Sequence, residues 1–300
     1  MLVYKYLDVD GAEKTIENKS VLLKCPTEYR DLFDSNFYLD DKERKKAFDL
    51  YVNYLIFEGL RSGTLKASTG YTKLLKKNAL LMELIIKKTS TFKKQLDLSV
   101  AYVLALKLLN KKDKDIRVQF NLVVDGILTK IREAILISCF GSSYDSSYLW
   151  SEYAEGHKGI CMEYDVDGDE YRKVQYKKEI PVFQFTKALE IYFGHQICNK
   201  EIDTNNKAFW FALDPIFTKL EKYKNEEEIR CVFSNKKRRK NIRELDGLML
   251  LEMPLPKRIF IGCRTSDDLE RIIRSAYPRV NVEKMKVFDS KKGKLLSSKE

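Results

Sequence analysis

The chain has 300 residues, of which 44% are hydrophobic and 33% are charged, and Lys and Arg outnumber Asp and Glu by 55 to 44. This length is enough for one large domain or two small ones with a buried core, and the apolar fraction excludes a disordered chain. No apolar run reaches the ~20 residues that a membrane-spanning helix requires, and the first residues lack the pattern of a secretion signal. We therefore expect a cytoplasmic protein with no membrane partner.

The net charge and the cysteine and histidine content limit which ligands and metal ions the protein is expected to bind. A formal net charge of +11 favours anionic partners, such as nucleotides, nucleic acid or acidic proteins. The six cysteines include no Cys-x-x-Cys pair and several stand in apolar runs, as buried free thiols do in a reducing compartment. His157 and His195 are the only histidines, so the sequence predicts no metal site of the zinc type.

Residues 1–40 have the pattern of a small β-rich opening. Residues 3–7 alternate with a period of two, and residues 20–24 form a second short apolar run that ends at Cys25-Pro26. We predict two strands here, with room for a short helix over residues 12–19.

Residues 41–131 are predicted to form a helical insert. Asp40 and Glu43 have the spacing of a capping box, and Gly59 is placed to end the first helix. Apolar side chains then recur at i, i+3, i+4, i+7 and i+8, which puts Phe48, Tyr51, Val52, Leu55 and Ile56 on one helix face. Similar stripes continue to residue 131.

Residues 132–290 return to a mixed pattern and are predicted to form the main α/β core, followed by a basic flexible tail over residues 291–300. Two short helices are expected over residues 148–154 and 267–276. Strands are expected at residues 134–140, 159–164, 229–233, 248–253 and 258–262. The whole pattern predicts an α+β fold, with a mixed β-sheet core built from the N- and C-terminal parts and a large helical insert.

Several separated segments form a pattern that recurs in one bacterial family. Residues 29–34 keep Asp31, Phe33 and Asp34 of a Phe-Asn-Asp-Pro-Phe-Glu/Asp pattern, with Arg30 and Leu32 as departures. The other segments are Tyr4–Tyr6, Leu22–Pro26, Ser138–Phe140, Leu149–Ala154, His157–Tyr164, Thr218-Lys219, Tyr223 (where the family has Trp), Glu226, Glu228, Arg230 and Pro256–Gly262. With these segments the chain resembles the family known as domain of unknown function 2971.

The resemblance covers both ends of the chain but not the helical middle. It implies that the distant segments belong to one α/β fold with helices inserted between them. It brings no established activity, and its general character implies a setting in bacterial antiviral defence or a toxin-like role.

Glu226 and Glu228 stand just before a predicted strand. With Arg230 they follow an i, i+2, i+4 spacing, which puts the three side chains on one face and indicates the rim of a cleft. The spacing resembles the Glu-x-Glu segment of ADP-ribosyltransferases. That resemblance makes Glu228 the catalytic carboxylate that stabilises an oxocarbenium-like transition state, Glu226 the acceptor-orienting residue and Arg230 a phosphate-binding or orienting group. The alternative is an exposed Glu–Arg ion pair of little energetic value.

Five further residues are candidates for the pocket of an NAD-like ligand. Trp150 and Tyr153 share a helix face and His157 follows just before a strand, so the three could shape a nicotinamide pocket, with His157 also counted among the catalytic candidates. Tyr4 and Lys5 on the first strand could bind a ribose or phosphate. The alternatives are a packed Trp, a His bonded to a local carbonyl, and an edge strand with solvated side chains.

A basic block stands in a predicted hairpin loop. It consists of Lys236, Lys237, Arg238, Arg239 and Lys240. Such a block either contacts nucleic acid or is a solvated loop.

The first hypothesis for function is therefore an NAD- or nucleotide-using enzyme of ADP-ribosyltransferase type. Two alternatives stay open. One is a non-catalytic module that binds nucleic acid or a partner through its basic helical middle. The other is a magnesium-dependent nuclease in which Asp31, Asp34 and Glu228 converge on the ion.

Overall fold

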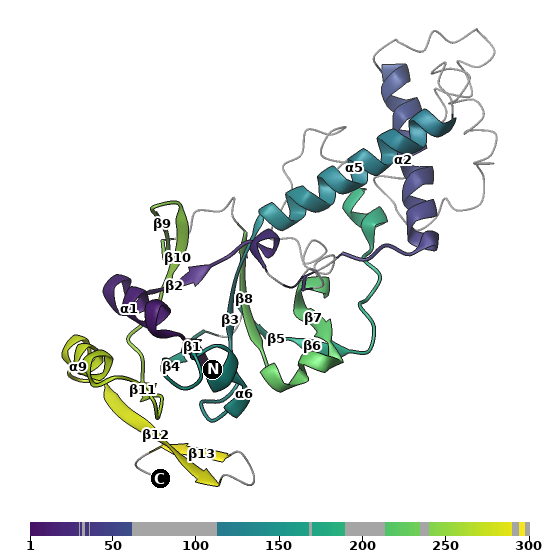
Figure 1. Ribbon diagram of the computed structural model, residues 1–300. Coiled ribbons are helices and arrows are strands. Elements are labelled where there is room, and N and C mark those ends of the chain that lie inside the picture. The colour runs from purple at the N-terminus through teal and green to yellow at the C-terminus, as the bar shows by residue number, and fades with distance from the viewer. Residues whose placement is uncertain are drawn as a thin grey trace, which may run out of the picture. The chain divides into compact units, whose positions relative to one another are not determined.

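A computed structural model describes residues 1–29, 31, 34–35, 37–61, 113–167, 170–189, 214–234, 240–289 and 294–297. Helices and mixed β-sheets alternate along the chain, so the protein has the α+β fold that the sequence predicts (Figure 1). None of the helices in these residues is both long and apolar enough to cross a membrane.

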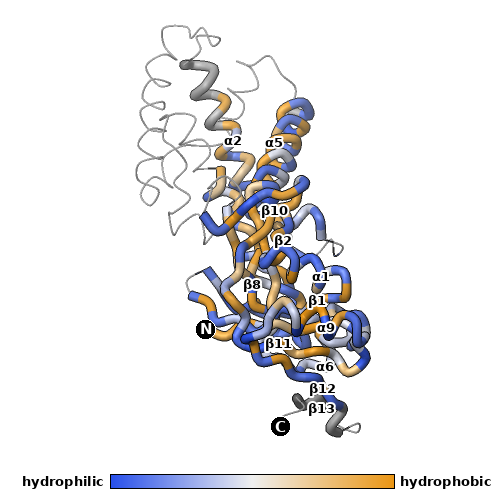
Figure 2. Tube along the Cα trace, turned by 90° about the vertical axis from the view of Figure 1, so that its left-hand side faces the viewer, coloured by the Kyte–Doolittle hydropathy of each residue, from blue (hydrophilic) through white to orange (hydrophobic). Residues whose placement is uncertain are grey.

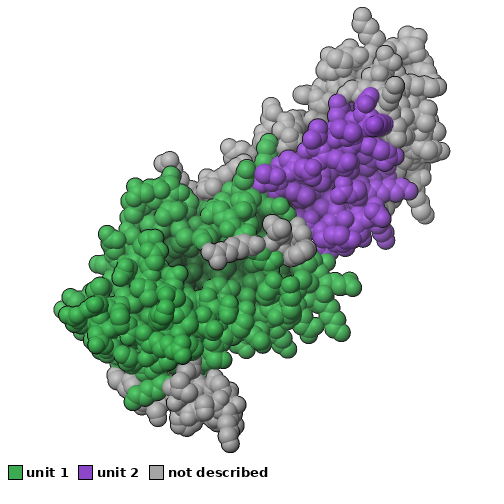
Figure 3. Space-filling view, in the orientation of Figure 1, with its two compact units in different colours: residues 1–36, 130–180, 216–300 green, residues 37–129, 181–215 purple. Residues whose placement is uncertain are grey.

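The chain divides into two compact units (Figure 3). Unit 1 contains residues 1–36, 130–180 and 216–300, and unit 2 contains residues 37–129 and 181–215. Residues 181–215 thus belong to unit 2, whereas the sequence pattern predicts them as part of the main core. All the strands of the described residues lie in unit 1, and the candidate site is built there.

The largest sheet of unit 1 joins the two ends of the chain. β1 pairs antiparallel with β4, β4 pairs antiparallel with β11, and β12 follows parallel to β11. The sheet order is β1 (Leu2–Leu7), β4 (Ile160–Asp165), β11 (Arg258–Ile261), β12 (Asn281–Asp289) and β13 (Lys294–Ser297). This confirms that the N- and C-terminal parts share one mixed sheet. The prediction of a flexible tail is wrong for residues 294–297, because they form β13 and pair with β12.

Three smaller sheets complete unit 1. The first has the order β2 (Ser20–Leu23), β10 (Leu248–Glu252) and β9 (Ile242–Leu245). The second has the order β3 (Ile135–Phe140), β8 (Ile229–Ser234) and β5 (Tyr171–Lys173), and the third pairs β6 (Gln175–Lys177) with β7 (Thr218–Leu220). Single bridges, Tyr4 to Gly141 and Lys24 to Ile137, connect β3 with its neighbours β1 and β2.

The helices begin where side-chain caps are available. Asp8 caps α1 (Val9–Asn18), Ser146 caps α6 (Ser147–Glu152) and Ser266 caps α9 (Asp267–Ala276), each by accepting a backbone N–H of the first turn. On α9, Leu269 and Ile273 are buried, and Figure 2 shows hydrophobic and hydrophilic residues alternating along this helix. Short 3₁₀ turns are η1 (Pro26–Glu28), η3 (Asp214–Phe217) and η4 (Glu221–Glu226).

The predicted helical insert is partly seen. α2 (Asp41–Arg61) begins as expected, since the Glu43 N–H donates to Asp40 Oδ1 at 2.7 Å, and α5 (Asp113–Glu133) ends the segment. The expectation that Gly59 ends the first helix is wrong, because the helix continues to Arg61. A single glycine costs a helix only ~1 kcal/mol, which packing can offset. The other predicted helices lie outside the described residues.

The core of unit 1 lies on both faces of the largest sheet. Val3 packs with the main apolar cluster, whereas Tyr4 and Tyr6 pack with a second cluster around Trp150. Because alternate side chains of a strand point to opposite faces, Lys5 lies on the side of Val3 and away from Tyr4.

Gly159 offers a test of this packing. A Cβ on Gly159 would lie 1.9 Å from the Leu7 carbonyl oxygen, whereas a Cβ on Gly126 in α5 meets no atom within 4 Å. Gly159→Ala should therefore lower the free energy of unfolding by ~2 kcal/mol or more. Gly126→Ala should raise it by ~0.5–1 kcal/mol through helix propensity. Urea unfolding of both variants checks this; a Gly159→Ala protein as stable as the wild type would contradict the close approach.

Candidate functional site

Five charged side chains from three separate segments meet inside unit 1. They are the carboxylates of Asp34, Glu226 and Glu228 and the cations of Lys219 and Arg230. No more than 9% of any of these side chains is exposed. We call this group the buried charge network. Charges so deeply buried require paired and hydrogen-bonded partners, and the contacts supply them.

Arg230 is the most deeply buried member. On β8, Ile229, Cys231 and Phe233 face the main apolar cluster, so the alternation of the strand turns Arg230 to the other face. Its Nη2 donates to Asp34 Oδ1 at 2.7 Å and to Oδ2 at 2.8 Å, and its Nε donates to Glu228 Oε1 at 2.8 Å. The planar guanidinium thus holds two carboxylates from segments almost 200 residues apart.

Lys219 on β7 connects all three carboxylates. Its Nζ donates to Glu228 Oε2 at 3.0 Å and to Glu226 Oε2, and it lies 3.3 Å from Asp34 Oδ2. An ammonium group has three donors, so each carboxylate can take one. Lys219 is therefore the centre of the network, as Arg230 is its deepest part.

The turn between the two glutamates explains how both reach Lys219. Glu226 ends η4, and Glu227 adopts a left-handed conformation with φ of 42° before Glu228 leads into β8. Glu227 itself turns outward and accepts a hydrogen bond from Ser142 Oγ at 2.6 Å. The predicted i, i+2 alternation of a strand is thus wrong for Glu226 and Glu228, which share a face through this turn.

The two glutamates differ in their electrostatics. Burial acts to raise the pKa of Glu228, but Arg230 and Lys219 outweigh it and hold that pKa well below the usual range. For Glu226, burial is the larger effect and raises the pKa, although Lys219 acts against it. Glu228 is therefore a fixed negative charge, and Glu226 is the carboxylate that is readier to take a proton.

The Tyr153 hydroxyl contacts the network directly, whereas the described hydrogen bonds of Lys5 go to residues of β3. The Tyr153 hydroxyl donates to Glu226 Oε1 at 3.2 Å, and 48% of this tyrosine is exposed. Lys5 Nζ donates to Ser138 Oγ at 3.0 Å and to the Cys139 carbonyl at 2.9 Å. Burial lowers the pKa of Lys5, and the negative charge of Glu228 acts against this.

Tyr4, Trp150 and His157 are placed elsewhere. Burial raises the pKa of Tyr4 to about 12, and the neighbouring Glu163 carboxylate adds to this. Trp150 is a fully buried core residue, with its ring parallel to that of His157 at a centroid distance of 6.1 Å. The His157 backbone closes a turn by accepting the Arg264 N–H at 3.0 Å. Among the described contacts, those of these three residues lead into the second apolar cluster and not to the network.

Two outcomes correct the interpretation of the Glu-x-Glu segment. The prediction that this segment forms the rim of a cleft is wrong, because Glu226, Glu228 and Arg230 are all buried. The alternative of an exposed ion pair is wrong for the same reason. β8 is the central strand of its sheet, so residues at its start are covered from both sides.

The carboxylates of the nuclease hypothesis meet only in part. Asp34 and Glu228 converge, but they converge on Arg230, which donates hydrogen bonds to both oxygens of each carboxylate. Among the residues that the structure describes, no group of three or more His, Cys, Asp or Glu side chains is arranged to hold a metal ion.

The hairpin predicted around the basic block is wrong, because β8 pairs with β3 and β5 whereas β10 pairs with β2 and β9 in another sheet. Residues 236–239 lie outside the described residues, and Lys240 is exposed in the turn before β9. Its proposed contact with nucleic acid stays a prediction.

Lys219 is the functional candidate that the sequence interpretation missed. Its segment was noted in the family pattern, but a lone lysine in a short strand carries no signal of burial. Its three carboxylate partners identify it, and these come from the distant Asp34 and from the connection before β8.

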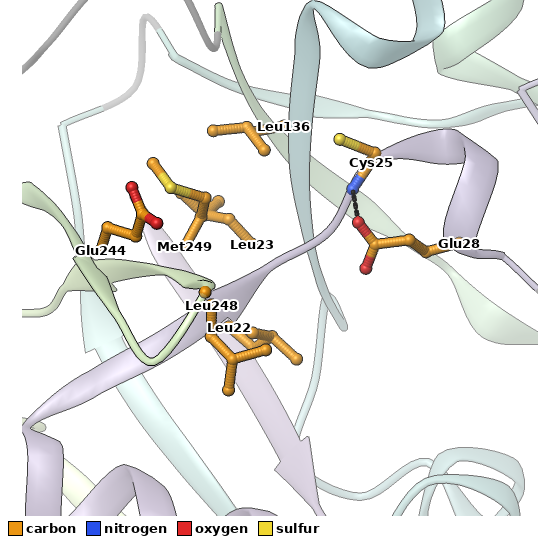
Figure 4. Close-up of a pocket in the computed structure, with 9 residues that line it drawn as sticks. Leu22, Leu23, Cys25, Glu28, Leu136, Glu244, Leu248 and Met249 are labelled. Atoms are coloured by element: carbon orange, nitrogen blue, oxygen red, sulfur yellow. Dashed lines mark hydrogen bonds between the residues drawn. The ribbon is translucent and has the colours of Figure 1, made fainter.

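A pocket of about 300 Å³ lies at the sheet of β2, β9 and β10 (Figure 4). Its lining consists of Leu22, Leu23, Cys25, Glu28, Leu136, Glu244, Gly247, Leu248 and Met249. None of these residues belongs to the buried charge network, and Glu28 is engaged by the Cys25 N–H at 3.3 Å. The buried charge network, and not this pocket, therefore carries the candidate catalytic chemistry.

Comparisons with protein-family models, with curated protein sequences and with solved structures found no match to this chain. Support for a function therefore comes from the geometry of the site.

The opposite pKa directions of the two glutamates predict opposite effects on stability. Glu228 has a lowered pKa, so its charge stabilises the fold above the usual glutamate pKa, and this is lost as the pH falls. Glu228→Gln should lower the free energy of unfolding at pH 7 by ~3–5 kcal/mol because Arg230 loses a buried partner. Glu226 has a raised pKa, so its ionisation costs stability, and Glu226→Gln should change it by less than ~1 kcal/mol.

Urea unfolding of both variants at pH 7 and pH 4 measures this difference. The deficit of Glu228→Gln should shrink at the lower pH. Equal losses for the two variants at pH 7 would contradict the assigned charge states.

Proposed function

We propose that the protein is an NAD- or nucleotide-using transferase of ADP-ribosyltransferase type, in which Glu226 is the carboxylate that meets the reacting ligand. The proposal includes a setting in bacterial defence or a toxin-like role, which is supported by the resemblance to domain of unknown function 2971. Its acceptor would be anionic or lie on an anionic partner, in keeping with the net charge of +11.

The observation that carries the proposal is the convergence of five buried charges at one point of unit 1. A buried ion pair is weak evidence for stability, because apolar side chains of similar volume often serve the fold as well. Strongly shifted pKa values in a charge cluster are instead typical of functional sites. Tyr153 and Lys5, from two further segments, add a hydroxyl and an ammonium group at its edge.

Charge balance favours Glu226 over Glu228 as the reactive group. Arg230 and Lys219 both neutralise Glu228, so little of its field is left for a cationic transition state. Glu226 has one cationic partner, Lys219, and one neutral partner, Tyr153, which is half-exposed and leads to solvent. The proposal therefore exchanges the roles that the sequence resemblance assigns to the two glutamates.

The chemistry would follow from this placement. The bond between the ribose C1′ and the nicotinamide nitrogen breaks, and nicotinamide leaves with the electron pair. The ribose then carries positive charge, which the carboxylate of Glu226 stabilises electrostatically. The acceptor forms the new bond to C1′ and releases its proton to Glu226, whose raised pKa suits it to that task.

Glu226→Gln tests the proposal directly, because it retains the size of the side chain and removes the charge. We expect NAD consumption by the purified protein to fall ~100-fold or more. Glu155→Gln is the matched control, since Glu155 lies outside the network and makes an exposed ion pair with Lys158 at 3.0 Å. A wild-type protein that neither consumes NAD nor gains thermal stability with it would exclude the proposal.

Tyr153→Phe should shift the pH dependence of the same reaction. The Tyr153 hydroxyl donates to Glu226 and so favours the charged carboxylate; removing it raises the pKa of Glu226 further. The acid limb of the rate profile should move to higher pH, by up to about one unit for a single hydrogen bond. An acid limb that stays in place would show that another group titrates.

A further inference from the structure

The chain enters and leaves unit 2 next to the buried charge network. Unit 2 begins after residue 36, and the chain returns to unit 1 for the last time at Ile216. Asp34 and Ser35 immediately precede the first crossing. Asp34 of the network thus lies beside the first of the four crossings, and Ile216 at the last crossing accepts a hydrogen bond from Arg230 of the network.

Arg230 is hydrogen-bonded to residues at both of these crossings, before residue 37 and at residue 216. Its Nη1 donates to Ser35 Oγ at 3.0 Å and to the Ile216 carbonyl oxygen, while Nη2 takes both oxygens of Asp34. The remaining donor, Nε, holds Glu228 at 2.8 Å. Any shift of either crossing therefore breaks a hydrogen bond to a fully buried charge or moves Glu228 with it.

Asp34 also acts on the glutamates through Lys219. The Lys219 ammonium lies 3.3 Å from Asp34 and is shared with Glu226 and Glu228. If Asp34 withdraws, a negative charge leaves and Lys219 is divided between two carboxylates instead of three. Both changes lower the pKa of Glu226.

Within unit 2, the segment that follows the first crossing is hydrogen-bonded to the segment that begins at residue 181. The Phe183 N–H donates to the Tyr38 carbonyl at 2.7 Å, and the Thr186 N–H donates to Glu43 Oε1 at 2.8 Å. Phe37 is only three residues beyond Asp34. A rearrangement inside unit 2 that loosens these bonds therefore has a short covalent path to the network.

We propose that Asp34 and Arg230 couple unit 2 to the reactive carboxylates, so that the state of unit 2 regulates the site through its attached crossings. Asp34 is a positioning residue in this device, because it acts on Glu226 through Lys219 and on Glu228 through Arg230. The inference rests on the proposed function only for its effect on rate; the coupling itself is a property of the fold.

Hydrogen exchange measures the coupling without reference to activity. Glu43→Gln weakens a bond that lies wholly within unit 2, and Asp34→Asn weakens the attachment itself. Each should raise the exchange rate of the backbone amides of residues 226–234 by ~10-fold or more, because local unfolding of this segment then requires less free energy. Asp165→Asn is the matched control in unit 1, where Asp165 makes an exposed ion pair with Lys257 at 2.6 Å, and it should leave these amides unchanged.

Faster exchange that stays confined to unit 2 in Glu43→Gln would overturn the proposal. If Asp34→Asn does not fold, Ser35→Ala replaces it and should show the same pattern, since it removes one bond to Arg230 and no charge. The acid limb of NAD consumption in Asp34→Asn should move to lower pH, as a lowered pKa of Glu226 requires. Coupled exchange without any NAD consumption would exclude the proposed function and leave the coupling standing.

Discussion

The burial of the Arg230 guanidinium is the constraint on which the site depends. A group that keeps its charge at every accessible pH and has no exposed surface must satisfy all its donors inside the protein. Asp34, Ser35, Ile216 and Glu228 meet this demand. One side chain on β8 thereby holds residues from separate segments of unit 1, and Glu228 in turn shares the Lys219 ammonium with Glu226.

The alternation of two strands decides which candidates take part. On β8 it separates Arg230 from Ile229 and Cys231, which belong to the apolar cluster. On β1 it separates Lys5 from Tyr4, so one of the two reaches the β3–β8 sheet and the other packs against the aromatic cluster. Two neighbouring residues that the sequence offers together as ligand-binding candidates therefore have different surroundings, one at β3 and the other in the aromatic cluster.

Periodicity predicts the parts of this fold that depend on local pattern. The helix start at Asp41, the helix over residues 267–276 and the strands β3, β4, β8 and β11 follow from caps and apolar runs. Burial of the charged residues does not follow from pattern, since Glu226-Glu227-Glu228 reads as a solvated segment. The left-handed turn at Glu227 and the partners Asp34 and Lys219 come from tertiary contacts that no local spacing encodes.

The network holds three carboxylates and two cations, which leaves one negative charge in excess at its centre. Lys5 compensates this charge only from the side of Ser138 and Cys139, and burial lowers its pKa. Burial is the larger cause of the raised pKa of Glu226, and the neighbouring Glu228 carboxylate adds to it, so the charge of Glu226 is costly where it stands. A ligand that brings positive charge to Glu226, as an oxocarbenium-like ribose does, would complete the balance that the chain itself leaves open.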